Sequence, residues 1–258
     1  MKSERHEALL SIVNEAGRVE VVELAQRLGV SEITARRDLL ELEADGFLRR
    51  VHGGAVPVSG RSSERPFRVR EQQQSAGKEA IAKAAAKMVN SGDAIALDVG
   101  STVLHMIDHL GHAANLTIVT ANLRTAWAVA NSKTLMRPFR LIVSGGVVRE
   151  DELSMTGESA LAHFRKMRVD IAFLGVAGVD PRAGVTDFNL DDVEIKRHLV
   201  ESARKTVVLA DHTKLGEVNF AQVADLHQLD LLITDMQAPR DQVEELRRAG
   251  LEIMQVKP

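Results

Sequence analysis

Seven short apolar segments in the last two thirds of the chain constrain its fold more than any other feature. Helix-like stretches separate most of them, for example at residues 122–131, 158–167 and 191–204, and another precedes the first. Continuous apolar strands that alternate with helices are typical of a mostly parallel sheet covered by helices on both faces. We therefore expect an α/β domain over residues 78–258. The segments lie at residues 94–99, 116–120, 140–144, 171–176, 206–210, 229–234 and 251–256.

The first part of the chain follows a different pattern. Apolar residues recur there at spacings of three and four, in short helical runs that each end at a glycine. β-prone residues then flank Gly53-Gly54, which is a hairpin signal. We expect a small helical domain with a β-wing at residues 1–57. The segment 58–77, rich in Ser and Gln and interrupted by proline, is predicted to be a linker that is partly helical near its end.

Composition excludes several classes of function. The chain has 33 Lys and Arg against 36 Asp and Glu, so any contact with nucleic acid must come from a local cluster of basic residues. The absence of cysteine excludes disulfides, iron–sulfur clusters and thiolate zinc sites. Few aromatic residues disfavour stacking on single strands. No apolar run approaches the ~20 residues that a membrane span needs. We expect a cytoplasmic protein with no cofactor and no membrane partner.

Two of the short helices fit a helix-turn-helix. They meet across Leu28-Gly29-Val30-Ser31, where glycine supplies the positive φ of the turn and valine fills the angle between the helices. With Ala35 and Leu39 turned inward, the polar residues near the start of the next helix point away from the core, where a recognition helix meets base edges. The hairpin would bring further basic residues to the DNA backbone. The predicted DNA-contacting residues are Ser31, Thr34, Arg36, Arg37, Arg49, Arg50 and His52.

Composition alone leaves an alternative open for this domain. Residues 1–55 hold eight Lys and Arg against ten Asp and Glu, so a small helical domain with solvated arginines fits equally well. The motifs favour DNA. Residues 21–31 (VVELAQRLGVS), 34–39 (TARRDL) and 50–55 (RVHGGA) resemble the winged helix-turn-helix of the DeoR family of bacterial transcription regulators. The resemblance covers nearly all of residues 3–56 and implies binding to double-stranded operator DNA. Ala35 departs from it, because the family usually has a larger aliphatic residue there.

The segment Asp98-Val99-Gly100-Ser101-Thr102 follows a predicted strand and opens a helix. A glycine, successive N–H groups and two hydroxyls at such a place favour an anion, typically a phosphate. A plain turn with a helix cap is the alternative. Other polar strand ends, at residues 120–122, 144–146, 175–178 and 210–214, belong to the same edge of a parallel sheet, where ligands bind. We therefore expect one pocket.

About residues 75–236 resemble the effector domain of DeoR-family regulators and are similar to the fold of ribose-5-phosphate isomerase. The resemblance implies a phosphorylated sugar or related metabolite as effector. Its phosphate would contact Gly100, Ser101 and Thr102, helped by Lys214. Candidates for contacting its hydroxyls are Asp98, Asn122, Gly145, Asp187, Lys196 and Asp211.

The isomerase carboxylates are missing from the corresponding positions. The segment at the first position reads Gly175-Val176-Ala177-Gly178 and has no acidic residue. The second position corresponds approximately to Lys196, with Glu194 close by in the sequence. Proton transfer needs a general base, so we expect a pocket that binds without catalysis. Two other classes stay open: an isomerase with an accessory helical domain, and a protein-binding winged helix with a vestigial pocket.

His105 and His109 have the i, i+4 spacing of metal ligands on a helix. They lack a third ligand in the local sequence, and a solvated or packed helix gives the same pattern. We therefore predict no metal site.

A helix-turn-helix protein usually binds two half-sites about one helical turn apart. We expect a homo-oligomer, a dimer or tetramer held mainly by the C-terminal domains. In this hypothesis it represses a carbon-utilisation operon until a sugar phosphate weakens its binding to DNA.

Overall fold

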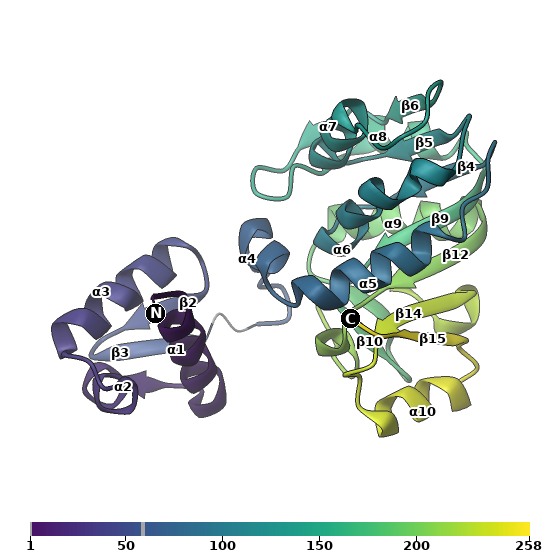
Figure 1. Ribbon diagram of the computed structural model, residues 1–258. Coiled ribbons are helices and arrows are strands. Elements are labelled where there is room, and N and C mark those ends of the chain that lie inside the picture. The colour runs from purple at the N-terminus through teal and green to yellow at the C-terminus, as the bar shows by residue number, and fades with distance from the viewer. Residues whose placement is uncertain (1, 58–59) are drawn as a thin grey trace. The chain divides into compact units, whose positions relative to one another are not determined.

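The computed structural model describes residues 2–57 and 60–258. The chain divides into two compact units, Met1–Arg70 and Glu71–Pro258, each described below by itself (Figure 1). Of the predicted linker, residues 58–59 lie outside the described residues. The remainder contains helix α4 (Phe67–Gln72) and the first residues of helix α5 (Ser75–Ala86).

The first unit is a winged helix-turn-helix. Helices α1 (Lys2–Ala16), α2 (Val21–Leu28) and α3 (Glu32–Ala44) pack on a three-stranded antiparallel sheet. The predicted hairpin is confirmed as β2 (Leu48–Val51) and β3 (Gly54–Pro57), and β3 also pairs with a short strand β1 (Val19–Glu20) that the sequence did not predict.

Two local features set the geometry of this unit. Gly29 ends α2 with φ 65°, and the Ser31 side chain accepts a hydrogen bond from the Thr34 N–H at 3.2 Å to cap α3, as the sequence predicted. Gly54 of β3 approaches β1 so closely that only glycine fits, because a Cβ there would lie 2.0 Å from the Val19 carbonyl oxygen. Ala35, the departure from the family pattern, is fully buried in the core between the helices.

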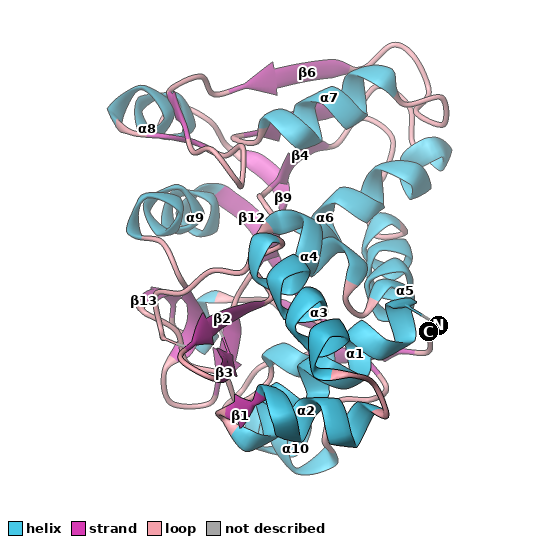
Figure 2. Cartoon of the chain, turned by 90° about the vertical axis from the view of Figure 1, so that its left-hand side faces the viewer, coloured by secondary structure: helices cyan, strands magenta, loops and turns pink. Residues whose placement is uncertain are grey.

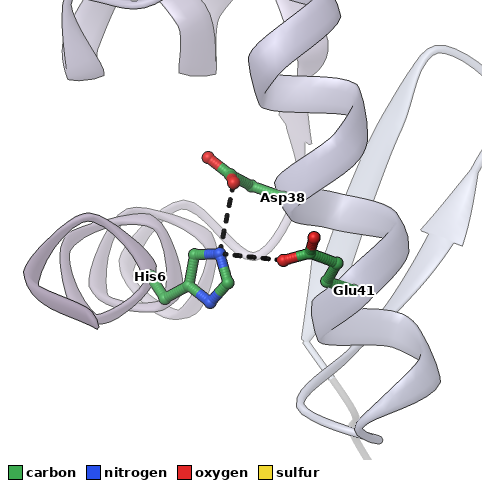
Figure 3. A group of neighbouring side chains, drawn as sticks. All are labelled: His6, Asp38 and Glu41. Carbon is green, nitrogen blue, oxygen red and sulfur yellow. Dashed lines mark hydrogen bonds and ion pairs between the residues drawn. The ribbon is translucent and has the colours of Figure 1, made fainter. Parts of the chain in front are cut away.

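A buried carboxylate ties α1 to α3. The Arg5 guanidinium donates two hydrogen bonds to Asp38, at 2.6 and 3.0 Å. The Asp38 side chain is 2% exposed. His6 Nε2 lies 3.2 Å from Asp38 Oδ1 and 3.7 Å from Glu41 Oε2 (Figure 3). Hydrogen bonding to Arg5 is the main reason that the pKa of Asp38 is lowered. A lowered carboxyl pKa stabilises the folded state above the pKa of the unfolded chain.

Asp38→Asn is expected to lower the free energy of unfolding of the first unit by about 1–3 kcal/mol near neutral pH, because it removes a charged acceptor that is buried. The stabilisation disappears as pH falls through the lowered pKa of Asp38, so the difference from wild type should shrink below about pH 4. Denaturant unfolding at several pH values measures both effects. Glu20→Gln, at an exposed position, is the control. Equal stability of Asp38→Asn and wild type at neutral pH would contradict the assignment.

The second unit is built on a seven-stranded sheet in which every neighbouring pair is parallel. All seven predicted strands are confirmed, with ends shifted by a few residues. In sheet order they are β15 (Ile253–Val256), β14 (Leu231–Asp235), β12 (Ala203–Leu209), β9 (Val169–Gly175), β4 (Ala94–Leu97), β5 (Thr117–Thr120) and β6 (Arg140–Val143).

Helices cover both faces of this sheet (Figure 1). Along β4, Ile95 and Leu97 face one layer and Ala96 faces the other. The first layer contains α5, α6 (Ser101–His105), η1 (Met106–His112) and α7 (Leu123–Asn131). The second contains α8 (Glu158–Phe164), α9 (Leu190–Ser202) and α10 (Arg240–Arg248). No helix among the described residues has the length and apolar character that crossing a membrane requires.

Several short elements were not predicted. An antiparallel sheet joins β10 (Gly178–Asp180), β11 (Gly184–Asp187) and β13 (Ala221–Ala224), and a small hairpin joins β7 (Val147–Val148) to β8 (Met155–Thr156). The 3₁₀ turns η2 (His212–Lys214) and η3 (Leu226–Gln228) were also missed. Segments of two to four residues are too short to show a period.

The strand order fixes where a ligand can bind. The chain enters the sheet at β4, moves outward through β5 to β6, and then returns to β9 on the other side of β4. The β4–β9 boundary is therefore the topological switch point, where the connections diverge and leave a crevice at the carboxyl ends of the strands.

Candidate DNA-contacting surface and effector site

The recognition helix α3 presents its predicted residues outward. The side chains of Arg36 and Arg37 are 58% and 77% exposed, and each is near a glutamate one turn away, at 3.5 and 3.4 Å. Ser31 and Thr34 lie at the start of the helix, with their hydroxyl oxygens 2.9 Å apart. Exposed ion pairs of this kind contribute at most about 1 kcal/mol. Phosphate or base acceptors on DNA can therefore replace the glutamates at small cost.

The β2–β3 wing is tied to the recognition helix through Glu43. This carboxylate accepts the Arg50 backbone N–H at 2.8 Å and lies 3.8 Å from the Arg50 guanidinium. Arg49 is exposed on the same strand, and His52 is exposed at the turn of the hairpin. The Glu43–Arg50 contacts thus link the strand that carries Arg49 and Arg50 to α3.

Sequence reasoning missed Ile33, whose side chain is 81% exposed on α3 beside Thr34. An apolar group at the start of a recognition helix can contact the methyl group of thymine. A sequence signal did exist, because position 33 lies off the apolar stripe formed by Ala35, Leu39 and Leu42.

At the switch point, two glycine-containing segments come into close contact. Gly175 is the last residue of β9, and a Cβ there would lie 2.5 Å from the Val99 carbonyl oxygen. Gly100 has φ 140°, and a Cβ at this residue would lie 3.5 Å from the Gly175 Cα. A side chain at Gly175 would push the ends of β4 and β9 apart, and the φ of Gly100 is one that residues with a side chain rarely adopt. The two glycines thus allow the segment 100–102 to lie against the end of β9.

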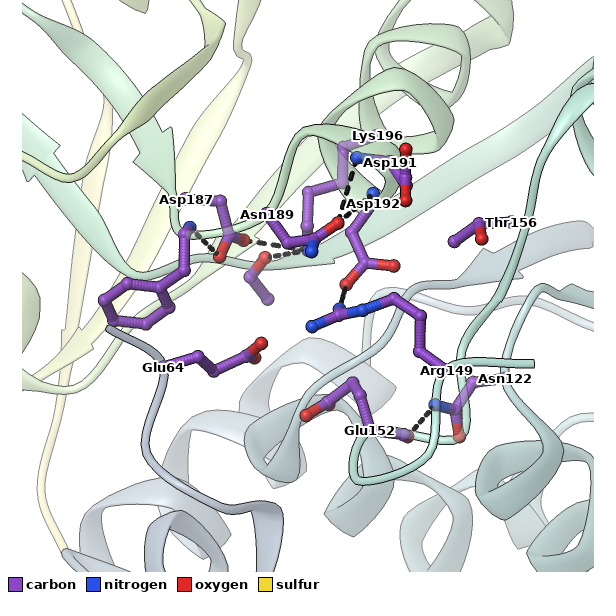
Figure 4. Close-up of polar contacts among 12 residues, drawn as sticks. Glu64, Asn122, Arg149, Glu152, Thr156, Asp187, Asn189, Asp191, Asp192 and Lys196 are labelled. Atoms are coloured by element: carbon purple, nitrogen blue, oxygen red, sulfur yellow. Dashed lines mark hydrogen bonds and ion pairs between the residues drawn. The ribbon is translucent and has the colours of Figure 1, made fainter. Parts of the chain in front are cut away.

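A buried lysine holds this junction together. Lys196 extends from α9 and is 1% exposed. Its ammonium donates to Asp98 Oδ2 and, at 2.6 Å, to the Gly175 carbonyl, and lies 3.3 Å from Asp187 Oδ2. Figure 4 shows Lys196 and Asp187 in this cluster. Three acceptors match the three protons of an ammonium group. Lys196, predicted to contact effector hydroxyls, thus also joins α9 to the ends of β4 and β9; its contact with the effector stays a prediction.

The cluster carries more negative than positive charge. Burial is the main cause that raises the pKa of Asp98 to about 6, although Lys196 opposes the shift. Burial lowers the pKa of Lys196, but the carboxylates of Asp98 and Asp187 outweigh it, so the pKa of Lys196 is raised and the ammonium stays charged. One lysine thus faces two carboxylates, and their negative charge favours hydrogen-bond donors nearby.

Asn122 connects the end of β5 to the loop that follows β7. Its side-chain oxygen caps α7 by accepting the Thr125 N–H at 2.9 Å, and its amide donates to the Glu152 carbonyl at 2.8 Å (Figure 4). In the same loop Arg149 forms an ion pair with Asp192 of α9 (Figure 4). Sequence reasoning missed this ion pair, since its members are 43 positions apart and no local pattern joins them.

The other predicted effector contacts lie at further strand ends. Ser101 and Thr102 are buried in the first turn of α6, after β4. Gly145 is exposed after β6 with φ 70°. Asp211 follows β12 and caps η2, which ends at Lys214, by accepting the Thr213 N–H at 3.0 Å. The structure thus clusters Asp98, Asp187 and Lys196 and places the rest after the carboxyl ends of β4, β5, β6 and β12.

A second buried carboxylate also went unpredicted. Asp235, at the end of β14, is fully buried and accepts the His212 backbone N–H at 2.9 Å and the His212 Nδ1 at 3.0 Å. It fixes the segment after β12 against β14. The histidine–aspartate pair spans 23 positions and has no local sequence signature.

The histidines at metal-ligand spacing contact a carboxylate from another helix. His105 Nδ1 and His109 Nε2 lie 3.1 and 2.6 Å from the two oxygens of Glu79 on α5. Among the described residues, one group brings three donor atoms within 4.8 Å of one another, namely His6, Asp38 and Glu41. There the bidentate Arg5 guanidinium already occupies the Asp38 carboxylate. We assign both clusters to helix–helix contacts.

Comparison with known families identifies the class. Residues 5–60 match the profile of the DeoR-like helix-turn-helix domain, and residues 73–236 match that of the DeoR C terminal sensor domain. The two matches correspond to the winged helix and to the sheet with its switch-point cluster. The chain belongs to the DeoR family of transcriptional regulators.

Relatives of this family match almost the whole chain. The HTH-type transcriptional regulator GolR of Listeria innocua is 32% identical over 97% of both chains. The glycerol-3-phosphate regulon repressor of Escherichia coli is 32% identical over 92% of both chains. The repressor GlcR of Bacillus subtilis is 30% identical over 98% of this chain and 96% of its own. Among solved structures, ribose 5-phosphate isomerase a from Methanocaldococcus jannaschii is 21% identical over 53% of this chain and 52% of its own, with a TM-score of 0.38.

Lys196→Met is expected to lower the free energy of unfolding by about 3–5 kcal/mol, because it leaves the Asp98 and Asp187 carboxylates buried without a counter-charge. Denaturant unfolding followed by circular dichroism measures the loss. Lys205→Met, a half-buried lysine on β12, is the control. Unchanged stability in Lys196→Met would show that the cluster does not hold the junction.

Proposed function

We propose that the chain is a repressor whose first unit binds operator DNA and whose second unit binds a phosphorylated sugar or related metabolite. The effector weakens operator binding, and the active form is a homo-oligomer in the cytoplasm. One observation carries the proposal: the same chain joins a recognition helix with two exposed arginines to a glycine-and-hydroxyl segment, Gly100-Ser101-Thr102, at the switch point of a parallel sheet.

The DNA-binding half rests on the outward face of α3. Arginine offers a forked donor to guanine or to phosphate, and threonine offers both a hydroxyl and a methyl group. Arg36, Arg37 and Thr34 supply these groups, with Ser31 at the helix start. On the wing, Arg49, Arg50 and His52 would contact the backbone, which positions the protein without reading sequence.

The effector half rests on the charges at the switch point. The N–H groups and hydroxyls of Gly100, Ser101 and Thr102 suit a phosphate, assisted by the cation of Lys214. The carboxylates nearby suit a ligand rich in hydroxyls. Candidate acceptors and donors for these hydroxyls are Asp98, Asn122, Gly145, Asp187, Lys196 and Asp211. The name of one relative, the glycerol-3-phosphate regulon repressor of Escherichia coli, supports a phosphorylated carbon source as effector.

We infer binding without catalysis, and the contacts of the carboxylates support it. A sugar-phosphate isomerase needs a carboxylate free to remove a proton from carbon. In this chain Asp98 is enclosed by the Lys196 ammonium and the Gly175 N–H, and the segment from 175 to 178 has no acidic residue. Turnover of ribose 5-phosphate by the purified protein at enzyme-like rates would overturn this part of the proposal.

Replacing Arg36 or Arg37 with Ala is expected to weaken operator binding by about 1–3 kcal/mol if the residue contacts a base. Fluorescence anisotropy with a labelled fragment from the gene's own upstream region measures the affinity. Arg165→Ala, which removes an exposed arginine paired with Glu158 in the second unit, is the matched control. Unchanged affinity in both recognition-helix variants would remove these residues from the interface.

Thr102→Ala is expected to keep operator binding intact and to abolish release by the effector, because it removes a phosphate contact from the 100–102 loop. A thermal-shift screen of phosphorylated sugars identifies a binder, since ligand binding raises the melting temperature by mass action. The anisotropy assay is then repeated with that ligand. Ser159→Ala, an exposed hydroxyl on α8, is the control. A Thr102→Ala protein that the ligand still releases from DNA would show that the phosphate binds elsewhere.

A further inference from the structure

One edge of the sheet exposes an unusual amount of apolar surface. Trp127 on α7 and Val147 on β7 are 73% and 71% exposed. Four further side chains from the same part of the chain are more than a third exposed. We call this surface the β6 edge, and its members are Leu123, Trp127, Met136, Val143, Val147 and Val148.

The backbone at this edge is also open. Among the described strands, β6 has a neighbour on one side only, because it lies at the end of the seven-stranded order (Figures 1 and 2). An unpaired strand offers a row of N–H and carbonyl groups, and proteins normally protect such an edge with charge or a covering segment. The described side chains at the two central positions, Leu141 and Ile142, are apolar.

The β6 edge exposes a large indole side chain. Trp127 is the single tryptophan of the chain. Contiguous apolar patches on soluble proteins mark interaction sites, and tryptophan is enriched among the residues that contribute most to association. The β6 edge therefore fits a protein partner better than solvent.

The charges along the edge favour a second copy of the same chain. Residues 109–149 contain five Lys and Arg and no Asp or Glu. Of these, Lys133, Arg137 and Arg140 are exposed at the amino end of β6. Exposed Glu150 and Asp151 follow at the opposite, carboxyl end, in the loop that the Asn122 side chain anchors.

A two-fold axis across β6 would place the basic end of one copy against the acidic end of the other. Such an interface is isologous, because the same patch serves both copies. It also matches the paired half-sites that a helix-turn-helix protein reads. We propose that the β6 edge is the surface on which two copies of this chain associate. The inference rests on the oligomeric form of the proposed regulator and names its interface.

The single tryptophan makes a direct test possible in the full-length protein. Light scattering on a dilution series gives the mass, and the emission maximum and iodide quenching of Trp127 give its exposure in the same samples. We expect dimers at high concentration with a blue-shifted, protected Trp127, and a red shift with stronger quenching as dilution yields 28.2 kDa monomers. This measurement needs no variant.

Val147→Glu provides the second test, since a charge at the centre of an apolar contact should weaken dimerisation at least tenfold. Met236→Glu places the same charge at another exposed apolar site, 61% exposed, and should leave dimerisation unchanged. The protein could also form an oligomer in which Trp127 stays fully quenchable and whose mass does not change in Val147→Glu. That result would overturn this interface but not the oligomeric form of the regulator. A protein that stays monomeric at all concentrations with a protected Trp127 would show that the chain covers the edge itself. That result would overturn both the proposed interface and the oligomeric form of the regulator. Operator binding, measured separately, reports on the regulator.

Discussion

The second unit depends on the contact between the Lys196 ammonium, the Asp98 carboxylate and the Gly175 carbonyl. It ties α9 to the ends of β4 and β9 at the one place where the strand order reverses. Because Lys196 lies 1% exposed between two carboxylates, its charge cannot be removed without leaving them uncompensated. Gly100 and Gly175 lie against each other at the same junction, and the segment 100–102 that begins there is what the proposed phosphate would contact.

A buried carboxylate with a basic partner also joins two elements of the first unit. A buried carboxylate on the recognition helix, Asp38, is held by Arg5 of α1. Glu43 of the same helix holds the wing through Arg50. The inward face of α3 thus fixes the orientation of the helix, while the arginines of the outward face have only weak partners. This division lets a rigid helix present exchangeable charges, which is what contact with a polyanion requires.

The sequence predicted the alternating strands and helices, but it did not predict the contacts between residues that are far apart in the chain. Seven strands and the capped recognition helix were recognisable because buried strands are apolar runs and Ser31 caps locally. The sheet containing β11 and the Arg149–Asp192 pair were missed, since elements of two to four residues show no period and partners 43 positions apart leave no local mark. The sequence predicted that Lys196 contacts the effector, which stays a prediction, but it did not predict the pairing of Lys196 with Asp98, 98 positions away. Ile33 could have been found from its position off the apolar stripe.

The central claim is that one chain couples operator DNA to a phosphorylated metabolite. The most direct measurement is the affinity of the purified protein for its own upstream DNA as a function of salt, with and without a ligand found by thermal shift. The account predicts tight binding at low salt, a linear fall of the logarithm of the affinity with the logarithm of salt concentration, and release by the ligand. Failure to bind double-stranded promoter fragments even at low ionic strength would contradict it.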